Sequence, residues 1–113
     1  MTQTTTYAWE AKRTEETRMV EDALKGAGFE RVDAYRYNLA SIRVRVIDPQ
    51  FEGLSIDQRD TLVEPYLDKL PERTLGDIMT LLTFAPSELV QTPKTLRAFM
   101  RNAEFDDPSP SML

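Results

Sequence analysis

The side chains of this sequence that could do chemistry are carboxylates and arginines, because the chain of 113 residues has no histidine and no cysteine. It therefore lacks the commonest general base and metal ligand, and it can form neither a nucleophilic thiolate nor a disulfide. Asp60 and Asp77, with Asp48 and Glu52 as further oxygen donors, could bind a divalent cation or act in acid-base catalysis. The regular oxygen spacing of a calcium loop is missing, so we expect no metal site, no cofactor and no enzymatic activity.

The arginines form a second candidate site. Arg43 and Arg45 alternate with apolar residues, and Arg36 precedes them on another predicted strand. Together they could make a cationic stripe for nucleic acid or an acidic protein, but we favour the solvated face of a half-buried sheet. Arg59 could contact a partner or a phosphate, and here we favour a solvated helix residue. The net charge of -5 also disfavours a phosphate backbone as the main partner.

Composition indicates one folded domain over residues 1–113. The hydrophobic fraction is 41% and the charged fraction is 29%, as in ordinary globular proteins. A chain of this length can bury one modest core without disulfides. No signal-peptide core is present, and no apolar run approaches the ~20 residues of a membrane helix. We therefore expect a cytoplasmic protein without a membrane partner.

The first part of the chain predicts a helix followed by a β-hairpin. Residues 1–13 are Thr-rich and aperiodic, so we expect a flexible arm that Trp9 could pin to the body. Thr14 is a candidate N-cap for an amphipathic helix. Residues 30–48 read as two strands around a turn near residues 38–40, which gives the hairpin one apolar face and one basic face.

The middle of the chain predicts a capped helix and a third strand. Ser55 and Gln58 have the spacing of a capping box. Pro65 falls inside the apolar stripe that follows, so the helix should kink or restart there, and two short helices fit as well as one. Residues 75–84 are dense in apolar and β-favouring residues, which suits a buried strand.

The end of the chain predicts one more helix and a tail. Thr92 and Pro93 make an N-cap and first-turn pair for a helix over residues 92–104. Its apolar stripe could dock on the domain or be presented to a partner. Residues 105–113 are acidic and contain proline, and we expect them to be disordered.

The segment FEGLSIDQRDTLV, residues 51–63, resembles the hallmark of the BolA family. In that family an aromatic-x-Gly-x-Ser loop follows the second strand and leads into a helix with an Arg and then a Leu-Val pair. The matching residues are Phe51, Gly53, Ser55, Arg59, Leu62 and Val63. Residues 83–89, TFAPSEL, are similar to the segment that closes the family's third strand, with Ala85 where a capping Thr is usual.

The resemblance extends from residue 15 to about residue 90 and implies an α+β fold. A BolA-like domain is a three-stranded sheet packed against helices, related to the type II KH arrangement, and it contains a helix-turn-helix-like pair. Residues 14–91 would form this core, and the C-terminal helix would be an addition to it.

This sequence departs from the family where the family binds iron-sulfur clusters. Asp60 occupies the helix position that usually carries a His beside the Arg, and Asp77 occupies the third-strand position of the cluster-binding His. The predicted hairpin turn, residues 37–41, contains no Cys or His either. Carboxylates are poor substitutes for imidazole or thiolate at such a cluster. We therefore expect no bound cluster and no partnership with monothiol glutaredoxins through one.

These observations favour a non-enzymatic binding or adaptor domain that acts through a protein partner. The candidate partner contacts are Arg59, Asp60, Asp77, Arg43 and Arg45. The residues assigned to a structural motif are Phe51, Gly53, Ser55 and Gln58. Two alternatives stay open: a nucleic-acid-binding transcriptional regulator that uses the helix-turn-helix-like segment, and a carboxylate-based, metal-dependent enzyme.

Overall fold

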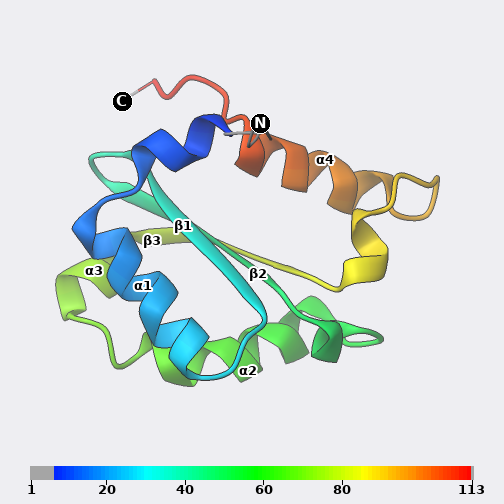
Figure 1. Ribbon diagram of the computed structural model, residues 1–113, viewed down its shortest axis with the longest axis horizontal. Helices are drawn as coiled ribbons and strands as arrows, with labels where there is room; N and C mark the ends of the chain where they lie inside the picture. The colour runs from blue at the N-terminus through cyan, green and yellow to red at the C-terminus, as the bar shows by residue number, and fades with distance from the viewer. Residues whose placement is uncertain (1–6, 113) are drawn as a thin grey trace, which may run out of the picture.

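A three-stranded sheet lies between two groups of helices in the computed structural model, which describes residues 7–112 (Figure 1). Residues 1–6 of the expected arm and the final residue of the chain lie outside the described residues. The elements are, in order, η1 (Ala8–Lys12), α1 (Glu15–Gly26), β1 (Arg31–Asn38), β2 (Ser41–Ile47), η2 (Pro49–Phe51), α2 (Ile56–Leu67), α3 (Glu72–Asp77), β3 (Ile78–Phe84), η3 (Pro86–Leu89) and α4 (Leu96–Asp106). The α+β class expected from the sequence is confirmed.

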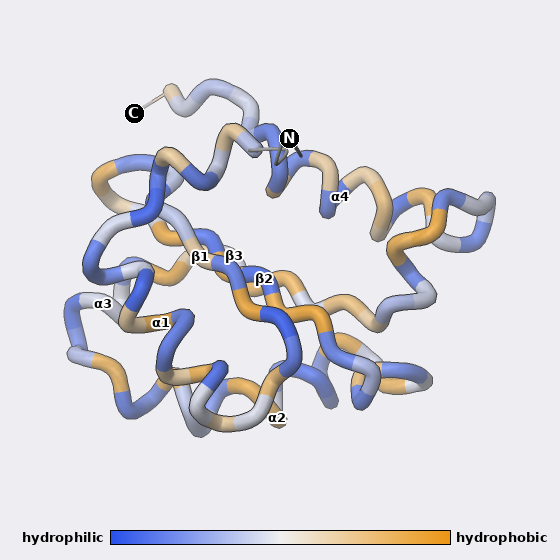
Figure 2. Tube along the Cα trace, in the orientation of Figure 1, coloured by the Kyte–Doolittle hydropathy of each residue, from blue (hydrophilic) through white to orange (hydrophobic). Residues whose placement is uncertain are grey.

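The sheet has the strand order β1-β2-β3, with β2 at its centre. β1 runs antiparallel to β2, so that Asp33 lies opposite Arg45. β3 runs parallel to β2, and its other side has no strand partner within the described residues. Because side chains alternate along a strand, β2 sends Val44 and Val46 to one face and its arginines to the other. Figure 2 shows hydrophobic and hydrophilic residues alternating along the strands of the sheet.

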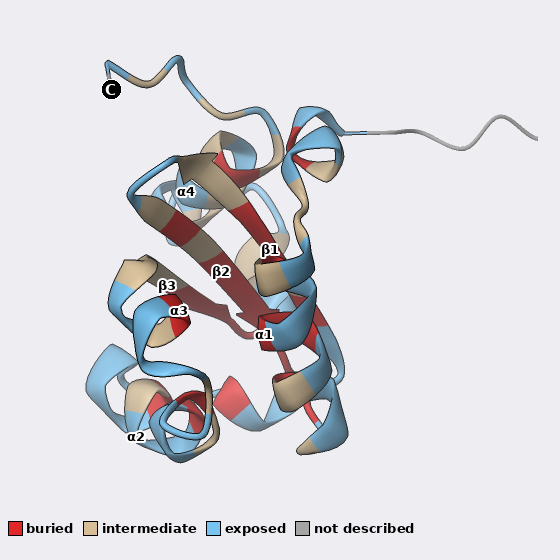
Figure 3. Cartoon of the chain, turned by 90° about the vertical axis from the view of Figure 1, so that its left-hand side faces the viewer, coloured by how far each residue is buried: buried red, intermediate tan, exposed pale blue. Residues whose placement is uncertain are grey.

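Helices α1 and α2 cover one face of the sheet and enclose an apolar core (Figure 3). α1 begins at a capping box in which Thr14 accepts a hydrogen bond from the Thr17 N–H, so the predicted N-cap is confirmed. Gly28, with a φ of +100°, lets the chain turn back toward β1. The buried residues of this core are Val20, Leu24, Phe29, Val32, Ala34, Ile42, Val44, Val46, Phe51, Val63, Leu67 and Ala85.

Helices η1 and α4 cover the other face with an aromatic core. Trp9 of η1 packs against Phe105 of α4 with ring centroids 5.6 Å apart, and Tyr35 of β1 lies 4.7 Å from Phe105. Trp9 is only 4% exposed, so residues 8–12 form an ordered 3-10 helix on the sheet and not a flexible arm. The C-terminal helix therefore docks on the domain (Figure 1).

The C-terminal helix and the segment after it differ from the sequence-based expectation. α4 spans Leu96–Asp106 instead of residues 92–104. Phe105, which was assigned to a disordered tail, is buried because its ring completes the aromatic core. Beyond the helix, Tyr37 donates a hydrogen bond from its hydroxyl to Pro110 O at 3.3 Å. The expectation of disorder is therefore wrong for this part of the chain.

The chain between α2 and β3 also differs. α2 continues through Pro65, which faces solvent, so the carbonyl that loses its intrahelical donor can be hydrated. A short helix, α3, begins after Pro71 and takes up the first residues of the predicted strand. β3 pairs with β2 only from Ile78 onward. Asp77 is consequently the last residue of a helix and not a strand residue.

Candidate functional site

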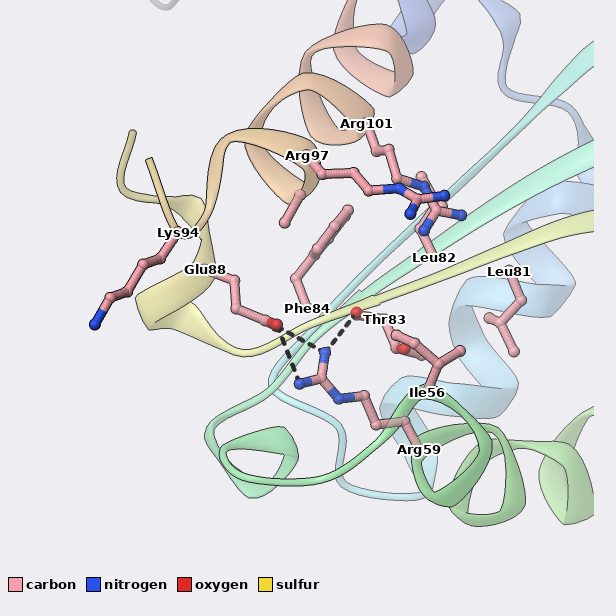
Figure 4. Close-up of a pocket in the computed structure, with 11 residues that line it drawn as sticks. Ile56, Arg59, Leu81, Leu82, Thr83, Phe84, Glu88, Lys94, Arg97 and Arg101 are labelled. Carbon is pink, nitrogen blue, oxygen red and sulfur yellow. Dashed lines mark hydrogen bonds and ion pairs between the residues drawn. The ribbon is translucent and has the colours of Figure 1, made fainter. Parts of the chain in front are cut away.

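Arg59 is a buried clamp between α2 and the end of β3. It is only 4% exposed. Its Nη1 donates to Thr83 O at 2.9 Å, its Nε donates to Leu54 O at 3.1 Å, and its guanidinium pairs with Glu88 of η3 at 2.7 Å (Figure 4). The expectation of a solvated residue is therefore wrong, and the donors that Arg59 would offer to a partner are already bonded inside the domain.

Glu88 holds the other half of this clamp. Its Oε1 also accepts a hydrogen bond from Ala85 N–H at 2.7 Å. Burial would raise the pKa of Glu88, but the hydrogen bonds from Arg59 and from Ala85 N–H outweigh that effect and hold the pKa below its ordinary value. Glu88 is therefore ionised at neutral pH, and its ion pair with Arg59 fixes the end of β3 relative to α2.

The central sequence motif has structural roles. Phe51 is fully buried, with its ring centroid 6.1 Å from that of Phe29. Gly53 has a φ of +74°, which a residue with a Cβ adopts only with strain. Ser55 and Gln58 exchange the two hydrogen bonds of a capping box, at 3.2 and 2.9 Å, so that prediction is confirmed. Together these residues set where α2 begins.

Arg45 lies beneath α4. It is 1% exposed. It donates to Asp33 of β1 at 2.7 Å and to Asn102 and Asp106 of α4 at 2.9 and 2.6 Å, and its guanidinium carbon lies 4.2 Å from the centroid of the Phe105 ring. The basic face of the hairpin is therefore not solvated, because α4 covers it and supplies carboxylates to it.

The other two sheet arginines are also paired. Arg43 donates to Glu104 of α4 at 2.8 Å and to the hydroxyl of Tyr35 at 3.1 Å. Arg36 points to the opposite face of the sheet, where it pairs with Glu16 of α1. The three arginines thus form no common cationic stripe.

Asp60 and Asp77 have separate surroundings. Asp77 accepts a hydrogen bond from Arg36 at 2.7 Å. Asp60 lies on α2, where burial and then the charges of Glu64 and Asp57 raise its pKa. Among the residues that the structure describes, no three His, Cys, Asp or Glu side chains are grouped to hold a metal ion.

A cleft of about 390 Å³ lies where β3, the start of α2 and α4 meet. Figure 4 shows Ile56 and Arg59 on one side of β3, and Arg97 and Arg101 on the other. The lining residues are Ile56, Arg59, Leu81, Leu82, Thr83, Phe84, Glu88, Lys94, Arg97, Ala98 and Arg101. A second hollow of about 140 Å³ shares Leu82 and Arg101 with it.

Three cations of this cleft were missed by the sequence interpretation. Lys94, Arg97 and Arg101 are exposed and have no ion pair within the part of the chain that the structure describes. Arg97 and Arg101 are four residues apart, a spacing that places them on one face of a helix, whereas Lys94 lies in the turn before α4. The sequence analysis considered only the apolar stripe of this helix and not its cations.

Comparison of the chain with protein-family models, curated proteins and solved structures finds no match. No helix among the described residues has the length and apolar character needed to cross a membrane.

Proposed function

We propose that this chain is a non-enzymatic binding or adaptor domain with a BolA-like arrangement, and that it binds a protein partner through the cleft beside β3. One observation carries the proposal: among the described residues, Arg97 and Arg101, which lie side by side on the α4 side of the cleft, have no carboxylate partner, whereas Arg36, Arg43, Arg45 and Arg59 each have at least one. In a chain with a net charge of -5, a cluster of unpaired cations beside a cleft favours an acidic partner.

The lining of the cleft supports binding rather than catalysis. Its titratable groups, among the described residues, are the Arg59–Glu88 ion pair and the three free cations. Leu81, Leu82 and Ile56 add apolar surface between them. Apolar area with a few convergent charges is the usual composition of a protein-binding surface. Because Glu88 is already bonded to Arg59, the cations can hold an anionic group but have no free carboxylate base among the lining residues to transfer its protons.

The arginines that the nucleic-acid alternative requires are not free to bind phosphate. Arg59, Arg43 and Arg45 were its proposed phosphate contacts, and all three are bonded to carboxylates inside the domain. The carboxylate-enzyme alternative is weakened similarly, because Asp77 is paired with Arg36 and the charged groups that shift the pKa of Asp60, among the described residues, are two carboxylates of its own helix.

The BolA-like part of the proposal is supported by element order and by the motif. A helix, a hairpin, a helix pair and a third strand follow one another as the resemblance implies. Phe51 and Gly53 have the packing and turn roles expected of the motif. Asp77, at the end of α3, is engaged with Arg36 where the family would place a cluster ligand. We therefore propose an adaptor that works without a cluster.

Site-specific photocrosslinking tests the proposed function. A benzophenone amino acid is placed at Ile56, which is 49% exposed in the cleft, or at Leu39, which is 96% exposed in the hairpin turn. After irradiation in lysate of the source organism, we expect a protein adduct at position 56 only, and we expect Arg97→Glu/Arg101→Glu to abolish it. An adduct that nuclease removes, or equal adducts at both positions, would contradict the proposal.

A further inference from the structure

We propose that the partner segment is an extended peptide of alternating acidic and apolar residues that adds a fourth strand to the open edge of β3. Its carboxylates would lie against Arg97 and Arg101. This inference rests on the proposed protein-binding function and specifies the chemistry of the ligand. It is carried by three features: the backbone groups at the edge, the two sides of the cleft, and the unpaired charges.

The backbone of β3 offers free hydrogen-bonding groups at this edge. Phe84 O accepts from Asp48 N–H at 3.1 Å on the β2 side, whereas Thr83 O accepts from Arg59 at 2.9 Å on the opposite side. Successive residues of a strand direct their backbone groups to opposite sides. Leu81 therefore directs its N–H and C=O to the open edge, as Thr83 directs its N–H. No turn, loop or side-chain hydrogen bond of the described residues uses these groups.

The clamp limits how far an added strand can extend. Arg59 already occupies Thr83 O, and η3 begins at Pro86, just beyond the end of β3. At the other end, the register with β2 shifts between Ile42 and Arg43, which interrupts the regular alternation at Met79. The regular open edge is thus short and centred on Leu81. A short edge of this kind suits a peptide segment better than a long sheet extension.

The two sides of β3 differ in chemistry. Leu81 packs with the apolar core beneath α1 and α2, whereas Leu82 and Phe84 belong to the core beneath α4. An added strand follows the same alternation. One set of its side chains would face Ile56 and Leu81, and the other would face the α4 cations (Figure 4). The ligand should therefore alternate apolar and acidic residues.

Charge disfavours the other occupants of the cleft. A second copy of the chain, paired edge to edge about a two-fold axis, would place Arg97 and Arg101 near their own equivalents, and like charges would repel. A nucleic acid could use the cations but would leave the strand edge and the apolar side of the cleft unused. Only an acidic extended peptide uses all three features.

The experiment measures binding of a fluorescein-labelled peptide of alternating Val and Glu to the full chain by anisotropy. We expect saturable binding that Arg97→Glu/Arg101→Glu weakens by at least about tenfold. Both arginines are exposed and unpaired, so the variant should fold normally, which circular dichroism checks. The matched control is Arg73→Glu, an exposed cation of α3 outside the cleft, which should leave binding unchanged.

Variants of the peptide test strand addition without altering the protein. N-methylation of alternate residues removes donors from one edge of the peptide only. We therefore expect one alternating set of N-methyl groups to abolish binding and the other set to preserve it. A peptide of the same composition in two blocks, Val then Glu, should bind more weakly.

Several outcomes would overturn the inference: equal binding of the block and alternating peptides, tolerance of both N-methyl sets, tighter binding of a single-stranded oligonucleotide of equal charge, or a concentration-dependent dimer that occupies the cleft. Failure of strand addition can be distinguished from failure of the proposed protein-binding function. If position 56 still yields a cleft-specific protein adduct while the alternating peptide does not bind, the protein-binding function holds and strand addition fails.

Discussion

The two faces of the sheet are buried by different means. Beneath α1 and α2, β2 contributes Val44 and Val46 to an apolar core. Beneath α4, the same strand contributes Arg43 and Arg45, which are covered by aromatic rings and paired with carboxylates. Polar residues that alternate with apolar ones in a strand therefore need not face water. They can also lie on the inner face of a layer whose covering helix supplies the opposite charges.

The two faces should therefore respond differently to mutation and to pH. An apolar core depends on buried area and packing, which change little with pH. The α4 face depends on ion pairs to Asp33, Glu104 and Asp106, so it should weaken when these carboxylates are protonated. Trp9, the single tryptophan of the chain, lies in the α4 layer and reports on that face alone.

The largest expected effect comes from Arg45→Ala. Removing this guanidinium leaves the carboxylates of Asp33 and Asp106 without their buried partner, which typically costs about 3–5 kcal/mol of unfolding free energy. Urea denaturation measures the loss. Arg101→Ala, which removes an exposed and unpaired arginine of α4, should change stability by less than about 0.5 kcal/mol. Similar costs for both variants would show that the buried ion pairs do not stabilise the α4 face.

On the opposite face, Val44→Ala should cost about 2 kcal/mol. The change removes two buried methyl groups and leaves a small cavity in the apolar core. Because Val44 does not touch the α4 layer, the native fluorescence of Trp9 should be unchanged, whereas Arg45→Ala should shift it. A Trp9 shift of equal size in both variants would mean that the two layers are not separate.

The contrast between the faces explains what the sequence could predict. The hairpin and the Thr14 and Ser55 caps depend on residues a few positions apart, and these predictions are confirmed. The environment of Arg45 depends on Asp106, which is 61 residues away. No local sequence pattern predicts such a contact, so Arg43 and Arg45 were predicted to lie on a solvent-exposed face.

The same distinction between local and long-range contacts applies to the candidate site. Arg59 was selected by its motif, but its acceptors Thr83 and Glu88 lie 24 and 29 residues away, and its burial was therefore not predicted. Asp77 was placed on a strand because apolar residues follow it, although Pro71 starts a helix that includes it. Of the cations beside the cleft, Arg97 and Arg101 of α4 have a spacing that the sequence alone could have placed on one helix face.

A smaller effect is expected from Glu104 and should depend on pH. Burial would raise the pKa of Glu104, but hydrogen bonds from Ser109 and Arg43 outweigh it and lower the pKa below its ordinary value of 4.5. Because the folded pKa is the lower one, the stabilisation is complete above pH 4.5 and is lost as the pH falls through the folded pKa. Glu104 is partly exposed, so solvent screening should keep the effect below about 1 kcal/mol.

The measurement compares wild type with Glu104→Gln by urea denaturation over a range of pH. The wild type should be more stable at neutral pH, and the difference should vanish in strong acid, where both side chains are uncharged. Trp9 fluorescence should follow the same acid transition. A stability difference that does not change with pH would indicate that Glu104 acts through packing and not through charge.

The smallest expected effect comes from Asp60, a charged residue on α2, which covers the apolar face of the sheet. The pKa of Asp60 is raised above its ordinary value of 3.8, first by burial and then by Glu64 and Asp57. A carboxyl with a raised folded pKa holds its proton more tightly in the fold than in the unfolded chain. The folded state is therefore penalised as the pH rises through 3.8, and the penalty is complete above the folded pKa.

Asp60→Asn should accordingly raise stability at neutral pH by about 0.5 kcal/mol, because it removes a partly buried charge and relieves like-charge repulsion from neighbours three and four residues away on α2. Asp57→Asn is the matched control with the opposite sign, since Asp57 lies in the first turn of α2, where a negative charge is favourable. Both variants are melted with and without millimolar Mg²⁺. If Asp60 belonged to a metal site, its neutralisation would also abolish a Mg²⁺-dependent gain in stability. We expect no such gain in the wild type, which would leave the burial of Asp60 and the repulsion along α2 as the causes.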